Sequence, residues 1–325
     1  MPLAVKRLKA RRREAVDGDV AERPGRHGAH DRVSIQALAR VERHARPPAD
    51  LDPALACTWQ ARVGGRHRLI PDGCVDVLWL DDGTLTVCGP ELRSWSFTLP
   101  PGTEAVGVRF RPGAAAGALR VPMSELRDQR VALDDVVGAA GARWLGDRLA
   151  DGTGEPRRQR QAFEGFVRRL VADDATDGAT AVVARLVDEQ AAGADELADA
   201  VGLSTRQLHR RCTAAFGYGP ATLARILRFQ RFVRSALGRG PHRSAPPPGG
   251  LARMAAEAGY ADQAHLSREC RAITDETPTA LVAALADTSV EALPDLDATR
   301  RHTSAAGACP IGSRPSVPDG ASSVG

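Results

Sequence analysis

The sequence contains no asparagine, and Lys6 and Lys9 are its only lysines among 325 residues. Its cationic charge is therefore almost entirely arginine, which presents several donors from one rigid planar group. It has only six cysteines, and no two of them form a Cys-x-x-Cys pair. This scatter excludes a zinc ribbon and a disulfide framework, and it is typical of a protein kept in a reducing cytoplasm.

Long apolar runs are also missing, since none approaches the ~18 residues that a membrane-spanning helix needs. The arginines near the N-terminus are not followed by the apolar core of a signal peptide. We therefore expect a cytoplasmic protein that does not bind a membrane. No spacing of residues predicts a catalytic centre, a resident metal or a cofactor, so we also expect a protein that is not an enzyme.

Acidic residues are absent from a forty-residue stretch, 204–243, that holds nine arginines. The formal net charge of the whole chain is only +4, so the distribution of charge is more informative than its sum. A charge run is usually the solvated face of a helix. A run of this length without a compensating acid favours a polyanionic partner.

Changes in composition and in hydrophobic periodicity along the sequence predict four segments. Residues 1–31 are charged and aperiodic, which predicts a disordered arm. Residues 32–172 form an N-terminal domain and residues 173–286 a C-terminal domain, with a hinge of small and acidic residues between them. The stretch 287–325 is rich in Pro, Ser and Gly, which predicts a disordered tail.

The N-terminal domain begins with short apolar runs separated by turn signals. The runs 75–80 and 85–87 flank an Asp-Gly pair at Asp82, which predicts a hairpin, and 105–110 predicts a further strand. Strands at this spacing indicate a small antiparallel β-barrel or sandwich. Apolar residues at helical spacing follow from Ala114 to about Ala172, so helices complete the domain.

Polar residues of the predicted strands leave several alternatives open. Arg109 and Arg111 alternate outward along one strand, where surface salt bridges are expected and an anionic ligand is the alternative. His67, Asp72 and Asp76 could be metal ligands, although a turn Asp and a strand-end Asp explain the two carboxylates. Three cysteines could form a redox sensor, but buried structural thiols are commoner: Cys57, Cys74 and Cys88.

A degenerate repeat lies in the C-terminal domain. The blocks "ELADAVGLSTRQLHRRCTAAFG" (196–217) and "GGLARMAAEAGYADQAHLSRECRAIT" (249–274) each contain a helical run that is interrupted at a glycine, Gly202 or Gly259. A second helical run follows each break. The chain therefore contains two helix–break–helix units.

In the first unit Asp195 is expected to cap a short helix, 196–201, and Ser204 to cap the next, 205–216. On that second helix Leu208 and Cys212 are four residues apart and face inward. Arg206, His209 and Arg210 then lie on the exposed face, where arginine can donate twice to guanine in the major groove. An ordinary helical hairpin with a solvated polar face is the alternative.

The second unit repeats this arrangement and favours the DNA-binding interpretation. Asp262 is the expected cap, and Leu266 and Cys270 take the buried positions. The exposed face then presents four polar residues: Gln263, His265, Ser267 and Arg268.

A continuous helix, 220–237, is predicted between the units, because the run starts with Pro and contains no internal Gly or Pro. Its eighteen residues span roughly 27 Å, comparable with the ~34 Å between successive major-groove faces. Its apolar residues can pack on both units. Four arginines are expected to remain for phosphates or solvent: Arg225, Arg228, Arg231 and Arg234.

The strings "ELADAVGLSTRQLHRRCTAAFGYGPATLARILRFQRF" and "LARMAAEAGYADQAHLSRECRAITDETPTAL" resemble the DNA-binding domain of the AraC/XylS family of bacterial transcription regulators. The Gly-Tyr-x-Asp-Gln-x-His-Leu-x-Arg string and the later Thr-Pro-Thr-x-Leu string are the most specific. The sequence departs from the family at Cys212 and Cys270, where Phe is usual, and in a longer link at 238–250. The resemblance implies promoter or operator DNA as partner, with these contact residues: Ser204, Thr205, Arg206, His209, Arg210, Gln263, His265, Ser267 and Arg268.

The N-terminal half, with "PADLDPALACTWQAR" and "VGVRFRPGAA", is similar to the N-terminal domain of an uncharacterised branch of the same family. In the wider family this position holds a cupin-like β-barrel that binds a small-molecule effector or mediates dimerisation. The resemblance therefore implies an α+β multidomain protein with an all-α double helix-turn-helix domain at its C-terminal end. It also allows contact with RNA polymerase and a homodimer.

We therefore expect a sequence-specific transcription regulator whose two helix-turn-helix units read successive major grooves under control of the N-terminal domain. One alternative is a DNA-repair methyl acceptor on the same DNA-binding fold, but its zinc-held cysteine cluster is not matched by the cysteines here. A second alternative is a helical adaptor that does not bind DNA. An affinity for DNA that depends on salt would distinguish the regulator from the adaptor.

Overall fold

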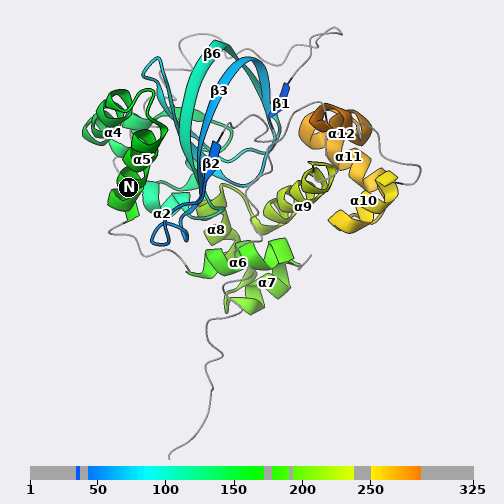
Figure 1. Ribbon diagram of the computed structural model, residues 1–325. Helices are drawn as coiled ribbons and strands as arrows, with labels where there is room; N and C mark the ends of the chain where they lie inside the picture. The colour runs from blue at the N-terminus through cyan, green and yellow to red at the C-terminus, as the bar shows by residue number, and fades with distance from the viewer. Residues whose placement is uncertain (1–33, 37–42, 172–177, 190–192, 238–249, 287–325) are drawn as a thin grey trace, which may run out of the picture. The chain divides into compact units, whose positions relative to one another are not determined.

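The computed structural model describes residues 34–36, 43–171, 178–189, 193–237 and 250–286 (Figure 1). All of these lie within one compact unit. The predicted arm, 1–31, and the predicted tail, 287–325, fall outside the described residues. Within the described part of the chain, no helix is both long and apolar enough to cross a membrane.

The N-terminal half is organised around a seven-stranded sheet in which two long strands pair antiparallel. These are β3 (Leu55–Leu69) and β6 (Trp95–Phe110). The strand order is β1-β3-β6-β4-β5-β7, and β2 also pairs with β3. The shorter strands are β1 (Ser34–Gln36), β2 (Arg43–Ala45), β4 (Val75–Leu80), β5 (Leu85–Cys88) and β7 (Arg130–Ala132).

The predicted cupin-like antiparallel architecture is confirmed, with two differences. The end strands β1 and β7 do not pair with each other in the part of the chain described, so the barrel is not closed. The short β1 also runs parallel to β3. The sheet is thus open and antiparallel, except that β1 pairs in parallel with β3 at one edge.

The predicted hairpin is confirmed as β4 and β5, which pair antiparallel. Its turn contains Gly83, whose φ of 89° is readily adopted by glycine, and the backbone N–H of Thr84 donates to Asp82 Oδ1 at 2.8 Å. Strand β6 begins ten residues earlier than the expected Ala105 because pairing with β3 carries it through 100–102. These three residues bulge opposite Gly64, which shifts the register and hides the strand from a local pattern.

Helices cover one face of the sheet and bury a common core with it. Strand β4 turns Val75, Val77 and Trp79 toward this core. The covering elements are α2 (Ala115–Leu119), η1 (Met123–Glu125), α3 (Leu133–Val137), α4 (Ala139–Asp151) and α5 (Pro156–Val171). The predicted apolar stripes on α4 and α5 are buried in it, with Phe163 and Val167 fully covered.

The described residues of the C-terminal half form helices and the loops between them, as predicted. Its elements are α6 (Gly178–Glu189), α7 (Ala194–Ala200), α8 (Thr205–Phe216), α9 (Pro220–Leu237), α10 (Gly250–Ala258), α11 (Gln263–Thr274) and α12 (Pro278–Ala286). Helix α9 belongs to two cores: Leu223 and Ile226 pack with α6 to α8, while Phe229 and Phe232 pack with α10 to α12. The expected packing of the central helix on both units is therefore confirmed.

Two glycines of the first unit allow a matched test of backbone strain. Both have positive φ, 64° at Gly202 and 85° at Gly217. A Cβ at Gly202 would meet no atom within 4 Å, whereas one at Gly217 would lie 2.8 Å from Pro90 Cγ and 3.1 Å from the Met123 carbonyl oxygen. We expect Gly202→Ala to cost about 1 kcal/mol of unfolding free energy and Gly217→Ala distinctly more, measured by urea denaturation. Equal losses would contradict this.

Candidate nucleic-acid interface and an internal pocket

Helix α8 is fixed at both ends by its own sequence. Ser204 Oγ accepts from the Gln207 N–H at 3.3 Å, and Gln207 Oε1 accepts from the Ser204 N–H at 2.9 Å. This capping box confirms the predicted start of the helix, and the left-handed Gly217 ends it. Leu208 and Cys212 are buried, as expected. The opposite face therefore leaves Arg206, His209 and Arg210 exposed.

The residues at the start of the unit differ from expectation in one respect. Helix α7 begins at Ala194 with Gly193 as its cap, so the predicted cap Asp195 is wrong by two positions. The Gly193 N–H donates to Glu196 Oε2, which secures this end. Asp195 instead accepts a hydrogen bond from Thr205 Oγ1 at 3.1 Å. The side chain of Thr205 thus joins the two helices of the unit.

Helix α11 repeats the arrangement in the second unit. Its cap is Asp262, as predicted, with Oδ1 accepting from the His265 N–H at 2.6 Å. Leu266 and Cys270 are fully buried. Both Gln263 and Arg268 are exposed at the helix surface.

The other two predicted contact residues of α11 already have intramolecular contacts. Ser267 Oγ donates to the carbonyl oxygen of Gln263 at 2.9 Å. The His265 ring packs edge-on against Tyr260, with centroids 5.1 Å apart and planes at 84°. Both residues are half-buried. Among the predicted residues of this unit, Gln263 and Arg268 are the most open to a partner.

The prediction that the arginines of α9 remain available for phosphates or solvent is wrong, because each has a contact within the protein. Arg225 forms an ion pair with Glu269 at 2.6 Å, and Arg234 forms one with Asp188 at 3.1 Å. Arg231 donates to the carbonyl oxygens of Ala258 and Asp188, and Arg228 lies 5.6 Å from the Tyr260 ring centroid. These side chains join α9 to its neighbouring helices. Two arginines of the stretch 204–243, Arg225 and Arg234, thus pair with acids from segments outside it.

A cavity of about 310 Å³ lies in the sheet domain, on the face of the sheet away from the helix-covered core. Its apolar lining comes largely from β3, β4 and β6, with Leu78 and Leu80 alternating with the core residues of β4. Trp59 and Phe97 add aromatic surface. Gln230 of α9 also lines it, which places a residue of the helical half beside the pocket.

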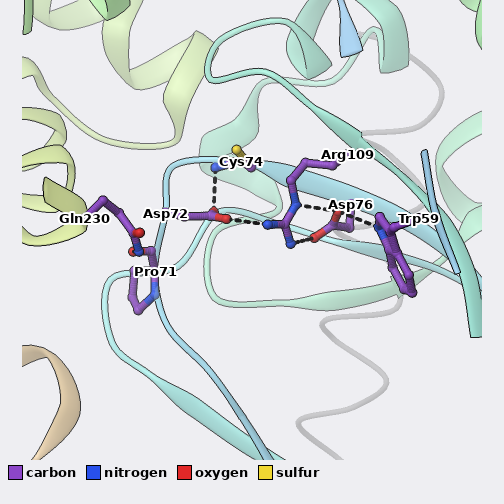
Figure 2. A network of polar contacts seen from close by, with 7 residues as sticks. All are labelled: Trp59, Pro71, Asp72, Cys74, Asp76, Arg109 and Gln230. Carbon is purple, nitrogen blue, oxygen red and sulfur yellow. Dashed lines mark hydrogen bonds and ion pairs between the residues drawn. The ribbon is translucent and has the colours of Figure 1, made fainter. Parts of the chain in front are cut away.

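A network of charged groups lies along this pocket (Figure 2). Arg109 donates from Nε and Nη2 to Asp76 at 2.9 and 2.6 Å, and from Nη1 to Asp72 at 2.8 Å. Asp72 also accepts from the Cys74 N–H, and Asp76 accepts from Trp59 Nε1. The predicted salt bridge of Arg109 therefore exists, but its expected surface location is wrong, since Arg109 is only 8% exposed.

In this network, burial and ion pairing shift the pKa values of the charged groups in opposite directions. Burial opposes the charge on Arg109, but Asp72 and Asp76 outweigh it and raise the pKa of Arg109 further above its ordinary value. Burial also raises the pKa of Asp72, and Arg109 opposes that rise only in part. Both carboxylates are held by an arginine, so the structure explains Asp72 and Asp76 without a metal.

Arg111, Cys57 and Cys88 have structural explanations. Arg111 forms an ion pair with Asp52 at 3.0 Å, in keeping with the predicted salt bridge. Burial raises the pKa of Cys57 to about 11 and that of Cys88 to about 12. Because the thiolate is the reactive form, this favours buried structural thiols over a redox sensor.

Two family models match the chain. Residues 197–284 match a helix-turn-helix domain, and residues 43–132 match a domain of unknown function, DUF6597. The predicted resemblance is thereby confirmed: the C-terminal half carries a helix-turn-helix domain of the AraC type. This match supports a DNA-binding transcription regulator.

Solved structures give a weaker likeness. ToxT from Vibrio cholerae O395 is 10% identical, with 70% of this chain and 96% of that chain covered and a TM-score of 0.40. ToxT from Vibrio cholerae strain SCE256 bound to an unsaturated fatty acid is 11% identical, with coverage of 69% and 93% and a TM-score of 0.37. Likenesses of this size assign no ligand to this chain. No match was found among curated proteins.

Proposed function

We propose that the chain regulates transcription by placing α8 and α11 in successive major grooves of promoter or operator DNA. The observation that carries this proposal is the matched pair of capped helices, each with an exposed arginine, Arg210 or Arg268, two residues after its buried leucine. One eighteen-residue helix, α9, packs in the cores of both units. Its length suits the separation of two groove faces on one side of a duplex.

The base-reading set is proposed to comprise Arg206, His209 and Arg210 in the first unit and Gln263 and Arg268 in the second. Ser204 and Thr205 act in our proposal at the start of α8, where a helix N-terminus can hold a phosphate. His265 and Ser267 are expected to contribute through their exposed parts. The arginines of α9 support the proposal indirectly, because Arg225 joins α9 to α11 through Glu269, and Arg231 and Arg234 join it to α10 and α6.

Control of DNA binding is proposed to come from the N-terminal domain, 32–172, acting on the C-terminal domain, 173–286. Three contacts support such coupling. Gln230 Nε2 donates to the Pro71 carbonyl oxygen at 2.6 Å, and Arg127 Nη1 donates to that of Gly217 at 3.2 Å. Arg68 forms an ion pair with Glu276. Homodimerisation and contact with RNA polymerase are further expectations of the resemblance.

The test is DNA binding by the full-length chain as a function of salt. A site is first selected from random duplexes, and affinity is then measured by fluorescence anisotropy between low and physiological salt. Contacts with Z phosphates should give a slope of about −0.9Z in a log–log plot. An affinity that does not change with salt, or that is equal for the selected and a scrambled site, would contradict the proposed function.

A further inference from the structure

The charged groups around the pocket do not balance. Three carboxylates line it, those of Asp72, Asp76 and Glu91, against two guanidinium groups, those of Arg109 and Arg130. The rest of the lining is mainly apolar or aromatic. With all five groups ionised, the lining carries one more negative than positive charge.

Both arginines of the pocket are already paired with carboxylates. Arg109 uses Nε and both terminal nitrogens on the two aspartates. Arg130 forms an ion pair with Glu91, and its guanidinium carbon lies 4.0 Å from the Trp95 ring centroid. A ligand carboxylate that separated one of these pairs would leave a buried carboxylate uncompensated, which is costly.

Asp72 can accept more hydrogen bonds than it does in this structure. Its Oδ1 accepts from the Cys74 N–H and its Oδ2 from Arg109, whereas Asp76 accepts three hydrogen bonds. A carboxylate offers about four acceptor positions. The Asp72 side chain is also 25% exposed, compared with 15% for Asp76. Burial raises the pKa of Asp72, so a second cation nearby would relieve an existing desolvation cost.

We propose that this pocket binds a hydrophobic amine, with its ammonium group on Asp72 and its apolar body against Trp59, Leu78 and Phe97. Aromatic faces favour cations, and about 310 Å³ suits a small organic molecule. The role of this ligand as an effector rests on the proposed function, but its binding does not. Pro71, which adjoins Asp72, accepts the hydrogen bond from Gln230 of α9, so the ligand lies one residue from a contact with the helical half.

The test compares three probes of one shape on the full-length protein: 4-phenylbutylamine, 4-phenylbutan-1-ol and 4-phenylbutanoate. Isothermal titration calorimetry at neutral pH is expected to give the tightest binding for the amine. A charged hydrogen bond in place of a neutral one should make this preference about 10-fold or more over the alcohol. The carboxylate should bind most weakly. Equal or tighter binding of the carboxylate, or no binding of any probe, would overturn the proposal.

A pair of variants then locates the amine. Asp72→Asn keeps one acceptor oxygen, for either Cys74 or Arg109, and removes the charge, so amine affinity should fall about 10- to 100-fold toward that of the alcohol. Asp147→Asn makes the same change on the exposed face of α4 and should leave the amine affinity unchanged. Equal amine affinities in the two variants would overturn the proposal. Should Asp72→Asn fail to fold by circular dichroism, the comparison of probes on the unaltered protein still decides.

DNA affinity of the same preparations separates the two proposals. Amine preference without sequence-specific DNA binding would remove the proposed function and leave the pocket proposal standing. DNA binding without amine preference would remove the pocket proposal and leave the proposed function standing. A change in DNA affinity on addition of 4-phenylbutylamine, absent in Asp72→Asn, would support the amine as an effector.

Discussion

Arg210→Ala is expected to weaken binding to the selected DNA site by about 1–3 kcal/mol and to relax preference at one base pair. The physical reason is that an exposed arginine on a helix in the major groove can donate two hydrogen bonds to guanine, and alanine can donate none. Arg268→Ala should do the same roughly one helical turn away, because it holds the matching position on α11. Each variant is measured by fluorescence anisotropy on the selected site and on base-substituted sites.

The matched control is Arg185→Ala on α6, an exposed arginine outside both reading helices. It removes the same charge, so any loss of affinity it causes should be equal for the selected and scrambled sites. An equal loss on both sites in Arg210→Ala would show that α8 does not read bases. Arg231→Ala is unsuitable as a control, because its contacts with Ala258 and Asp188 make it part of the folded framework.

Arg109→Met is expected to lower the free energy of unfolding by about 3–5 kcal/mol at neutral pH. The variant leaves the carboxylates of Asp72 and Asp76 near each other and without the cation that holds both. Urea denaturation measures the loss, and Asp72→Asn with Asp76→Asn in the same chain should recover part of it. A surface pair provides the control: Arg168→Met, which removes the partner of Asp50, should change stability little.

The loss of unfolding free energy in Arg109→Met should also depend on pH. Burial and the charge of Asp76 raise the folded-state pKa of Asp72, and removal of Arg109 leaves this rise unopposed. The penalty of the ionised Asp72 is then present at high pH and is relieved as pH falls through its raised pKa, because the protonated form is tolerated. The difference from the unaltered protein should therefore narrow between pH 8 and pH 5. A deficit that widens toward pH 5 would contradict this account.

The helix-turn-helix units could be predicted from the sequence because their signals are local. Ser204 and Asp262 begin their helices by bonding backbone three residues on, and Gly202 and Gly259 adopt positive φ at the breaks. The spacing of Leu208 and Cys212 defines which face of α8 is buried. Such features depend on a few neighbouring residues, so the sequence by itself determined the reading helices and their exposed arginines.

The tertiary structure decided what the strands and the central arginines do. Alternation along the predicted strand put Arg109 and Arg111 on one face but could not say whether that face meets solvent or a pocket, and Arg111 lies just beyond the end of β6. Strand β4 likewise turns Val77 to the helix-covered core and Asp76 to the cavity.

Other interaction partners could not be predicted because they lie far apart along the chain. Arg225 and Glu269 are forty-four residues apart, and the pairing that extends β6 joins Trp95 to Leu69 across the sheet. Non-local pairs of this kind leave no periodic signal, because any of several acids or strands could satisfy the same residue. Only the folded chain selects among them.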